Sequence, residues 1–200
     1  MREIDAAVLI KTIIKALIHC HANDVIHRDI KLENIMFNSK DVTDFSDIQI
    51  IDFGLSKKKE NGFGMLSTIV GSPYFTAPEV FEGNYGKEWD VWSLGVVLYV
   101  LLGGDYPYNA DTIPSLYSKI QRKDPKFKHE KWGNISEEAK DLIKKMLNRN
   151  SEKRITFENW LKHKWFDIIE ECHKGQNGLS EGYGEVVNCL KKYSSLTLLK

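Results

Sequence analysis

Apolar residues recur along two long stretches of the chain with the spacing of buried helices. Residues 5 to 22 are rich in helix formers, and their apolar positions cover more than one stripe of a helix surface. Residues 88 to 102 are apolar on every side, so a helix formed by them belongs at the centre of a domain. The apolar positions are Ala6, Val8, Leu9, Ile13, Ile14, Leu17 and Ile18 in the first stretch, and Val91, Trp92, Leu94, Val96, Val97, Leu98, Tyr99, Val100 and Leu101 in the second.

Two short apolar runs lie between these helices, at residues 34 to 37 and 48 to 51, and a polar segment separates them. This pattern is typical of two short strands joined by a loop. We expect an antiparallel pair that carries Asn34 and Asp52 side by side at its ends. Residues 55 to 72 are polar and contain glycines without a period, which predicts an irregular loop.

The second half of the chain is predicted to be helical. Amphipathic segments occupy residues 112 to 122, 136 to 147 and 156 to 162. Ser136 is a suitable N-cap for the second of these, because its hydroxyl can accept from a backbone N–H of the first turn. The sequence therefore predicts a mainly α fold with one small β hairpin.

The composition changes after Phe166, where the chain becomes polar and contains Gly175, Gly178, Gly182 and Gly184. This change indicates a linker. We place the domain at residues 1–171 and a linker, followed by the start of another helix, at residues 172–200.

The charge balance narrows the classes of partner. Lys+Arg and Asp+Glu are equal at 28 each, and 42% of the residues are hydrophobic. Nothing in this balance steers the whole molecule toward nucleic acid or an anionic membrane surface. The longest apolar run, residues 94 to 102, is about half of the ~20 residues that a membrane-spanning helix requires. We therefore expect neither a nucleic-acid partner nor a membrane span.

The cysteines favour an intracellular, cytoplasmic location. Cys20, Cys172 and Cys189 are an odd number at wide spacing, which is typical of reduced thiols. His19 and His21 flank Cys20, but residues two apart on a helix point about 200° apart and do not chelate one ion together. We expect no zinc site there.

The candidate chemistry lies at residues 27 to 34 and at Asp52. Transfer of a phosphoryl group requires a carboxylate that orients the attacking hydroxyl, a cation for the developing charge, and hard oxygens for magnesium. Asp29 is the candidate base, and Lys31 is the candidate cation. Asn34 and Asp52 supply the amide and carboxylate oxygens that Mg²⁺ prefers.

These residues resemble the motifs of eukaryotic protein kinases. The sequence His27-Arg28-Asp29, with Lys31 and Asn34, is similar to their catalytic loop, and Asp52-Phe53-Gly54 is similar to their magnesium-binding motif. Lys31 resembles the serine/threonine branch, although Leu32 stands where that branch often has proline. Further motifs follow in the family's order, namely Ala77-Pro78-Glu79, residues 90 to 95 and Arg154, and the resemblance covers about residues 4 to 171.

The resemblance implies the C-terminal lobe of the kinase fold, ATP and Mg²⁺ as cofactors, and protein serine or threonine as the acceptor. The catalytic residues are then Asp29 and Lys31. The cofactor-binding residues are Lys31, Glu33, Asn34, Met36 and Asp52, with Asn34 and Asp52 on magnesium. Met36 is expected beneath the adenine, although an ordinary core position is an equally good interpretation of that residue.

The resemblance also implies residues that position or regulate. Glu33 and Ser72 are expected to position the substrate. A carboxylate at Glu33 predicts preference for arginine upstream of the target, although an ordinary exposed glutamate is an equally good interpretation of that residue. Arg28 and Thr68 form the expected regulatory pair, because phosphate on Thr68 can bond to Arg28.

Two structural roles follow from the same resemblance. Asp90 is expected to hold backbone amides of the catalytic loop. Glu79 and Arg154 are expected to form a buried ion pair.

A complete protein kinase also needs a glycine-rich loop, a strand lysine and a glutamate that holds this lysine. Residues 1 to 200 contain none of these in the expected order, so we expect the N-terminal lobe to be absent from this chain and the isolated chain to be inactive. Two interpretations remain, the catalytic half of a serine/threonine kinase and a non-catalytic kinase-like binding module. The intact set Asp29, Lys31, Asn34 and Asp52 favours the first.

Within the kinases the chain is similar to the calcium/calmodulin-dependent group, through residues 71 to 80, 132 to 136 and 154 to 166. The tail resembles that of calcium-dependent protein kinases with their own EF-hands. Apolar residues recur there at near-helical spacing with lysines on the remaining surface, which suits a helix that binds a calcium sensor. A static helix packed on the domain is the alternative. The apolar positions are Val186, Val187, Leu190, Tyr193, Leu196 and Leu199.

Overall fold

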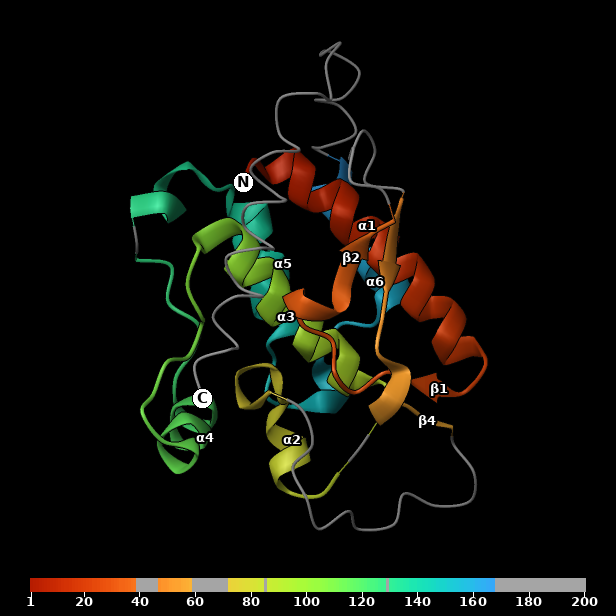
Figure 1. Ribbon diagram of the computed structural model, residues 1–200. Coiled ribbons are helices and arrows are strands. Elements are labelled where there is room, and N and C mark those ends of the chain that lie inside the picture. The colour runs from red at the N-terminus through yellow and green to blue at the C-terminus, as the bar shows by residue number, and fades with distance from the viewer. Residues whose placement is uncertain (39–46, 59–71, 85, 129, 168–200) are drawn as a thin grey trace.

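The fold is built around one fully buried helix. The computed structural model describes residues 1–38, 47–58, 72–84, 86–128 and 130–167. Helix α3 (Glu88–Gly103) lies in the middle of the molecule, and every residue from Trp89 to Gly103 is buried (Figure 1). It ends at Gly104, whose φ of 76° suits a residue without a side chain. The predicted core helix is confirmed.

Helix α1 (Glu3–Ala22) packs along α3, and its apolar face is buried. It confirms the helix predicted at residues 5 to 22. The start of α1 is tied to the end of the domain, because Glu3 accepts hydrogen bonds from Ser136 N at 2.9 Å and Trp165 Nε1 at 2.6 Å. The first helix thus holds together segments that are more than 130 residues apart in the sequence.

Two small antiparallel strand pairs flank these helices. Strands β2 (Ile35–Phe37) and β3 (Ile48–Ile50) form the antiparallel pair that the sequence predicted. Ile35 lies opposite Ile50 in this pair. Strands β1 (Val25–Ile26) and β4 (Lys57–Lys58) form a second pair that the sequence did not predict. Two residues are too few to show an alternating pattern, and a run of lysines looks like an ordinary solvated surface.

The remaining helices confirm the helical second half. They are α2 (Pro78–Phe81), α4 (Ile113–Arg122), α5 (Glu137–Met146) and α6 (Phe157–Trp160). Hydroxyl caps define three of their starts, because Thr112, Ser136 and Thr156 each accept from the backbone N–H three residues later. Helix α6 is shorter than predicted. After Trp160 the chain continues in tight turns, with Lys162 N bonded to Asn159 O and His163 N to Trp160 O.

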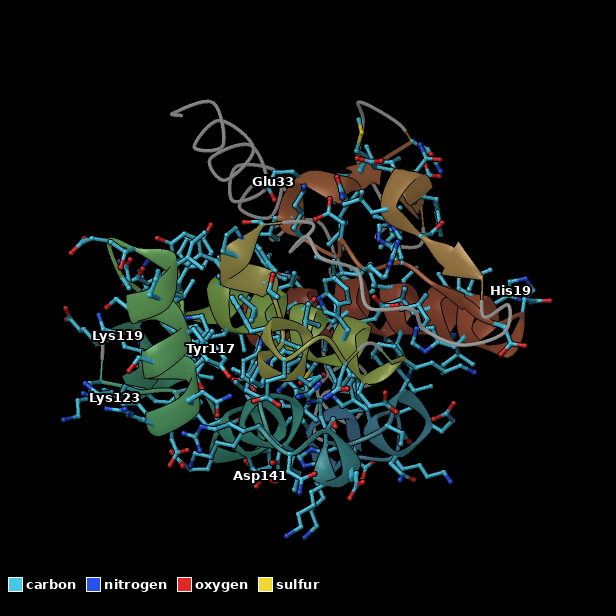
Figure 2. The ribbon with its side chains drawn as sticks, turned by 90° about the horizontal axis from the view of Figure 1, so that it is seen from below. His19, Glu33, Tyr117, Lys119, Lys123 and Asp141 are labelled. Atoms are coloured by element: carbon cyan, nitrogen blue, oxygen red, sulfur yellow. The ribbon has the colours of Figure 1, made fainter. Side chains whose placement is uncertain are left out.

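Short 3₁₀ turns connect the longer elements. They are η1 (Leu32–Asn34), η2 (Phe53–Leu55), η3 (Pro73–Phe75), η4 (Glu130–Asn134) and η5 (Ser151–Lys153). Figure 2 shows Glu33, on η1, at one side of the molecule and Asp141, on α5, at the opposite side. Most of the predicted loop at 55 to 72, with Thr68, and the predicted tail helix lie outside the described residues.

Candidate active site

The segment from His27 to Asp29 is held in place by α3. Asp90, in the first turn of α3, accepts from His27 N through Oδ2 at 3.0 Å and from Arg28 N through Oδ1 at 2.9 Å. Asp90 is fully buried, so these bonds replace the water that a carboxylate otherwise requires. The expected role of Asp90 as the anchor of this loop is confirmed.

Arg28 adopts a backbone conformation that few side chains tolerate. Its φ is 67°, in the left-handed region, and Asp90 holds the Arg28 amide and the amide of the preceding His27. A non-glycine residue there costs of order 1–3 kcal/mol and persists only where the surroundings hold it. Asp29 follows directly after this turn.

Asp29 is the centre of a compact polar cluster. Its Oδ2 lies 2.7 Å from Lys31 Nζ and 3.0 Å from Asn34 Nδ2, and Asn34 Nδ2 also donates to the Asp29 carbonyl at 2.8 Å. Asp29 and Asn34 are both 5% exposed, while Lys31 is half-buried. A cation and an amide thus fix one oxygen of Asp29, and its side-chain orientation is defined.

Asp52 lies next to this cluster because of strand pairing. Ile51 N donates to Asn34 O at 2.9 Å, so the residue after Ile51 begins beside the end of η1. Asp52 has a φ of 64°, and its Oδ1 accepts from Gly54 N at 3.2 Å. The backbone of Asn34 is thus bonded to the residue that directly precedes Asp52, as the predicted strand pair requires.

The side-chain oxygens of Asn34 and Asp52 are of the kind that binds a magnesium ion. Asn34 uses Nδ2 for its bonds to Asp29, which leaves the amide oxygen to meet a cation. Asp52 is exposed and carries a carboxylate. Mg²⁺ is commonly bound by one or two protein oxygens, with waters and phosphates in the other positions, and this pair suits that mode.

His27 connects the two halves of the site. Its Nε2 lies 3.2 Å from Ile51 O, its Nδ1 accepts from Asp29 N at 3.3 Å, and its ring packs edge-on against Phe53 at 4.6 Å between centroids. Burial lowers the pKa of His27, against the opposing effect of nearby carboxylates. A neutral ring with hydrogen on Nε2 satisfies both bonds.

The other predicted site residues lie around this centre. Glu33 is half-buried on η1, and Met36 on β2 is 47% exposed, so a ligand can cover it. Ser72 directly precedes η3, and its carbonyl accepts from Thr76 Oγ1 at 3.2 Å. Arg28 Nε donates to Leu55 O at 2.5 Å, which links the loop of residues 27 to 34 to the segment after Asp52. The sequence offered no signal for this last bond.

The predicted ion pair between Glu79 and Arg154 is also confirmed. Arg154 Nη1 and Nη2 lie 2.6 and 2.8 Å from the two carboxylate oxygens of Glu79. The Arg154 side chain is fully buried and also donates to Asn148 O and Glu88 O. Through Glu79 and Glu88 O, Arg154 joins α2 to the start of α3.

Comparison with known proteins decides the family. Residues 1–166 match the model of the protein kinase domain. The chain belongs to the protein kinase family. Among the residues that the structure describes, no helix is both long and apolar enough to cross a membrane.

The most similar relatives include calcium-dependent kinases. Calcium-dependent protein kinase 5 of Plasmodium falciparum is 42% identical over 164 residues, which are 82% of this chain and 28% of the relative. Calcium-dependent protein kinase 14 of Arabidopsis thaliana is 41% identical over 196 residues, 98% of this chain and 35% of the relative. Calcium/calmodulin-dependent serine/threonine-protein kinase 1 of Oryza sativa is 41% identical over 172 residues, 84% and 28% of the two chains.

This kinase chain is therefore similar to the calcium-dependent protein kinases over most of its length. It spans only about a third of the length of these curated relatives.

Proposed function

We propose that the described residues form the C-terminal lobe of a serine/threonine protein kinase that transfers the terminal phosphoryl group of ATP to a protein hydroxyl. The observation that carries this proposal is the Asp29 cluster, in which Lys31 and Asn34 fix one carboxylate oxygen at 2.7 and 3.0 Å. The second oxygen of Asp29 is then the one that accepts the proton of the attacking hydroxyl.

Each residue of the cluster has a distinct part in the reaction. The substrate hydroxyl oxygen forms a bond to the terminal phosphorus, the bond from this phosphorus to the bridging oxygen breaks, and the hydroxyl proton goes to Asp29. Lys31 stabilises the negative charge on the transferred group. Asn34 and Asp52 would hold Mg²⁺, which neutralises charge on the phosphates when it is bound.

The substrate side is proposed from three further residues. Glu33 favours an arginine upstream of the target serine or threonine, because a carboxylate pairs well with a guanidinium. Ser72 positions the target, and Met36 borders the nucleotide base. Arg28 couples the site to phosphorylation of Thr68, which brings a charge of about −1.5 to −2 near a guanidinium.

Regulation by calcium is proposed from the resemblance of the tail. The names of two relatives describe them as calcium-dependent protein kinases. Residues 186 to 199 of this chain have the apolar spacing of a helix that a calcium sensor can bind. We place this protein kinase in the cytoplasm. A binding module without catalytic activity is the alternative function.

The test is phosphoryl transfer by the full-length protein with and without calcium. We expect transfer to a peptide that has arginine before its serine, stimulated by calcium. Asp29→Asn should lower kcat by a factor of ~10² or more and leave nucleotide binding nearly unchanged, because the base acts in the transition state.

Asp52→Asn is the matched variant, since it makes the same chemical change at a residue proposed to act through metal. It should weaken magnesium-dependent nucleotide binding. Equal effects of the two variants on nucleotide binding contradict the assigned roles. Absence of transfer by the full-length wild type supports the binding module instead.

A further inference from the structure

Two tyrosine rings stack beyond the end of α3, next to a residue proposed to position the substrate. The Tyr106 ring lies 4.6 Å from the Tyr74 ring between centroids, with 26° between the ring planes, and it packs edge-on against Phe75 at 5.8 Å. Tyr74 is in η3, two residues after Ser72, and its hydroxyl donates to Ala110 O at 3.1 Å. Phe75 is buried, whereas the two tyrosines are half-buried, so part of the stacked pair remains open to solvent.

A carboxylate accompanies this pair. Asp105 directly precedes Tyr106 and is exposed. Its Oδ1 accepts from Tyr106 N at 2.8 Å, which keeps the carboxylate beside the tyrosine and leaves Oδ2 to meet a cation. Asp105 follows Gly104, the residue at which α3 ends. The end of the buried helix thus presents a carboxylate and an aromatic ring together.

Glu33 of η1 acts on the same ring. Burial raises the pKa of Tyr106 to about 12, and the negative charges of Glu33 and Asp105 act in the same direction. A charge has this effect only over a short distance, so the Tyr106 phenol lies within electrostatic reach of Glu33. Because Glu33 is proposed to take an arginine upstream of the target, the stacked tyrosines lie on the upstream side of the substrate site.

A tyrosine ring with carboxylates nearby is a suitable surface for a guanidinium. Arginine can stack its planar group on an aromatic face and donate from its edge to a carboxylate at the same time. Lysine lacks the planar group and gains less from such a surface. An acidic side chain would be repelled by Glu33 and Asp105.

We propose that Tyr106, Tyr74 and Asp105 form a second arginine subsite, which takes an arginine farther upstream of the target than the one assigned to Glu33. This inference rests on the proposed kinase function and narrows its substrates. The preferred acceptor is then a serine or threonine in a segment that carries two separate arginines upstream.

The experiment uses synthetic peptides and the full-length kinase. One peptide has a single arginine upstream of its serine, and the others carry a second arginine at each position farther upstream in turn. We expect the second arginine, at its best position, to raise kcat/KM roughly fivefold through a lower KM. With lysine in its place the gain should be smaller.

Three variants separate the parts of the subsite. Tyr106→Leu should remove nearly all of the gain from the second arginine, because the stacking surface is lost, whereas Tyr106→Phe should retain most of it. Asp105→Asn should reduce the gain, since the charged acceptor is lost. Glu33→Gln should weaken the response to the nearer arginine and leave most of the gain from the second arginine in place.

Tyr117→Leu is the matched control for lost packing. Tyr117 is a half-buried tyrosine of α4 whose ring packs against Phe81 at 4.8 Å and whose hydroxyl donates to Glu82 at 3.1 Å. Figure 2 shows it apart from Glu33. This variant should lower the unfolding midpoint and keep the full gain from the second arginine.

Equal kcat/KM for all peptides in the wild type, or a gain that Tyr106→Leu leaves intact, overturns the subsite while the kinase function stands. If the wild type phosphorylates no peptide, the kinase function fails, and peptide affinity measured by fluorescence anisotropy decides the subsite. Tighter binding of the two-arginine peptide that is lost in Tyr106→Leu supports it, and equal binding of all peptides overturns it.

Discussion

At the scale of single residues, Arg154 and Glu79 form an ion pair that is almost entirely shielded from solvent. The guanidinium is fully buried and donates to Glu79 and to two backbone carbonyls, and it lies 5.1 Å above the Trp92 ring. Removing one member of such a pair leaves the other without a partner in a medium that solvates charge poorly.

We therefore expect Arg154→Met to lower the free energy of unfolding by about 3–5 kcal/mol. Lys145→Met is the control, since Lys145 pairs with Asp141 at 2.7 Å but both side chains are about half exposed. That change should cost about 0–1 kcal/mol. Urea unfolding of the three proteins measures both values, and equal losses would show that burial does not determine the strength of the Glu79 pair.

Sequence-based prediction identified some of the important residues and missed others. The resemblance of residues 27 to 34 to the kinase catalytic loop singled out Asp29, Lys31 and Asn34 together, and hydrogen bonds join these three residues. The contact of His21 Nε2 with Asp90 Oδ2 at 2.7 Å was not predicted. The motif that His21 forms with His19 and Cys20 had drawn attention to metal binding instead. The position of His21 on the apolar face of α1, four residues after Leu17, was the signal that pointed to the core.

At the scale of elements, α3 and α5 approach each other closely at a glycine. A Cβ atom added to Gly95 would lie 2.8 Å from Met146 Cβ and 3.1 Å from Leu147 Cδ2. Both neighbours are buried, so neither side chain can move away without disturbing the core. The apolar pattern predicted α3 correctly, but it did not show which residue faces α5 at this distance.

Gly95→Ala should destabilise the domain by about 1–3 kcal/mol through overpacking, although alanine is the better helix former. Gly133→Ala, in η4, is the control because a Cβ there meets nothing within 4 Å. Its effect should be small. Unfolding midpoints in urea test the pair, and a stabilised Gly95→Ala variant would mean that the helices separate at little cost.

At the scale of the whole molecule, buried tyrosine side chains limit the stability of the fold at alkaline pH. Burial raises the pKa of Tyr99 to about 12 and that of Tyr106 to about 12, and it also raises the pKa of Tyr108. These side chains belong to the end of α3 and the segment after it, and Tyr99 donates to Lys126 O at 2.5 Å. The fold favours the protonated phenol.

The domain should therefore be fully stabilised by these groups below pH 10, the ordinary pKa of tyrosine, and lose this stability as the pH rises from 10 toward 12. In this range the unfolded chain releases protons that the folded chain retains. Urea unfolding between pH 9 and pH 12, followed together with tyrosinate absorbance, measures the decline.

Tyr99→Phe should be less stable at neutral pH, because it loses the bond to Lys126, yet its decline above pH 10 should be shallower. An identical decline in wild type and Tyr99→Phe would assign the alkaline loss to other groups.

The left-handed turns at Arg28 and Asp52 have a consequence for how such a domain can change over time. Both residues hold strained angles, with φ of 67° and 64°, and the strain is borne by α3 through Asp90 and by the strand pair through Ile51. The geometry of the proposed active site therefore depends on the packing of the core, which offsets this strain. Descendants of this protein that no longer need the proposed reaction can relax these two turns and gain folding stability. Descendants that keep the reaction must keep enough packing stability around α3 to offset the strain.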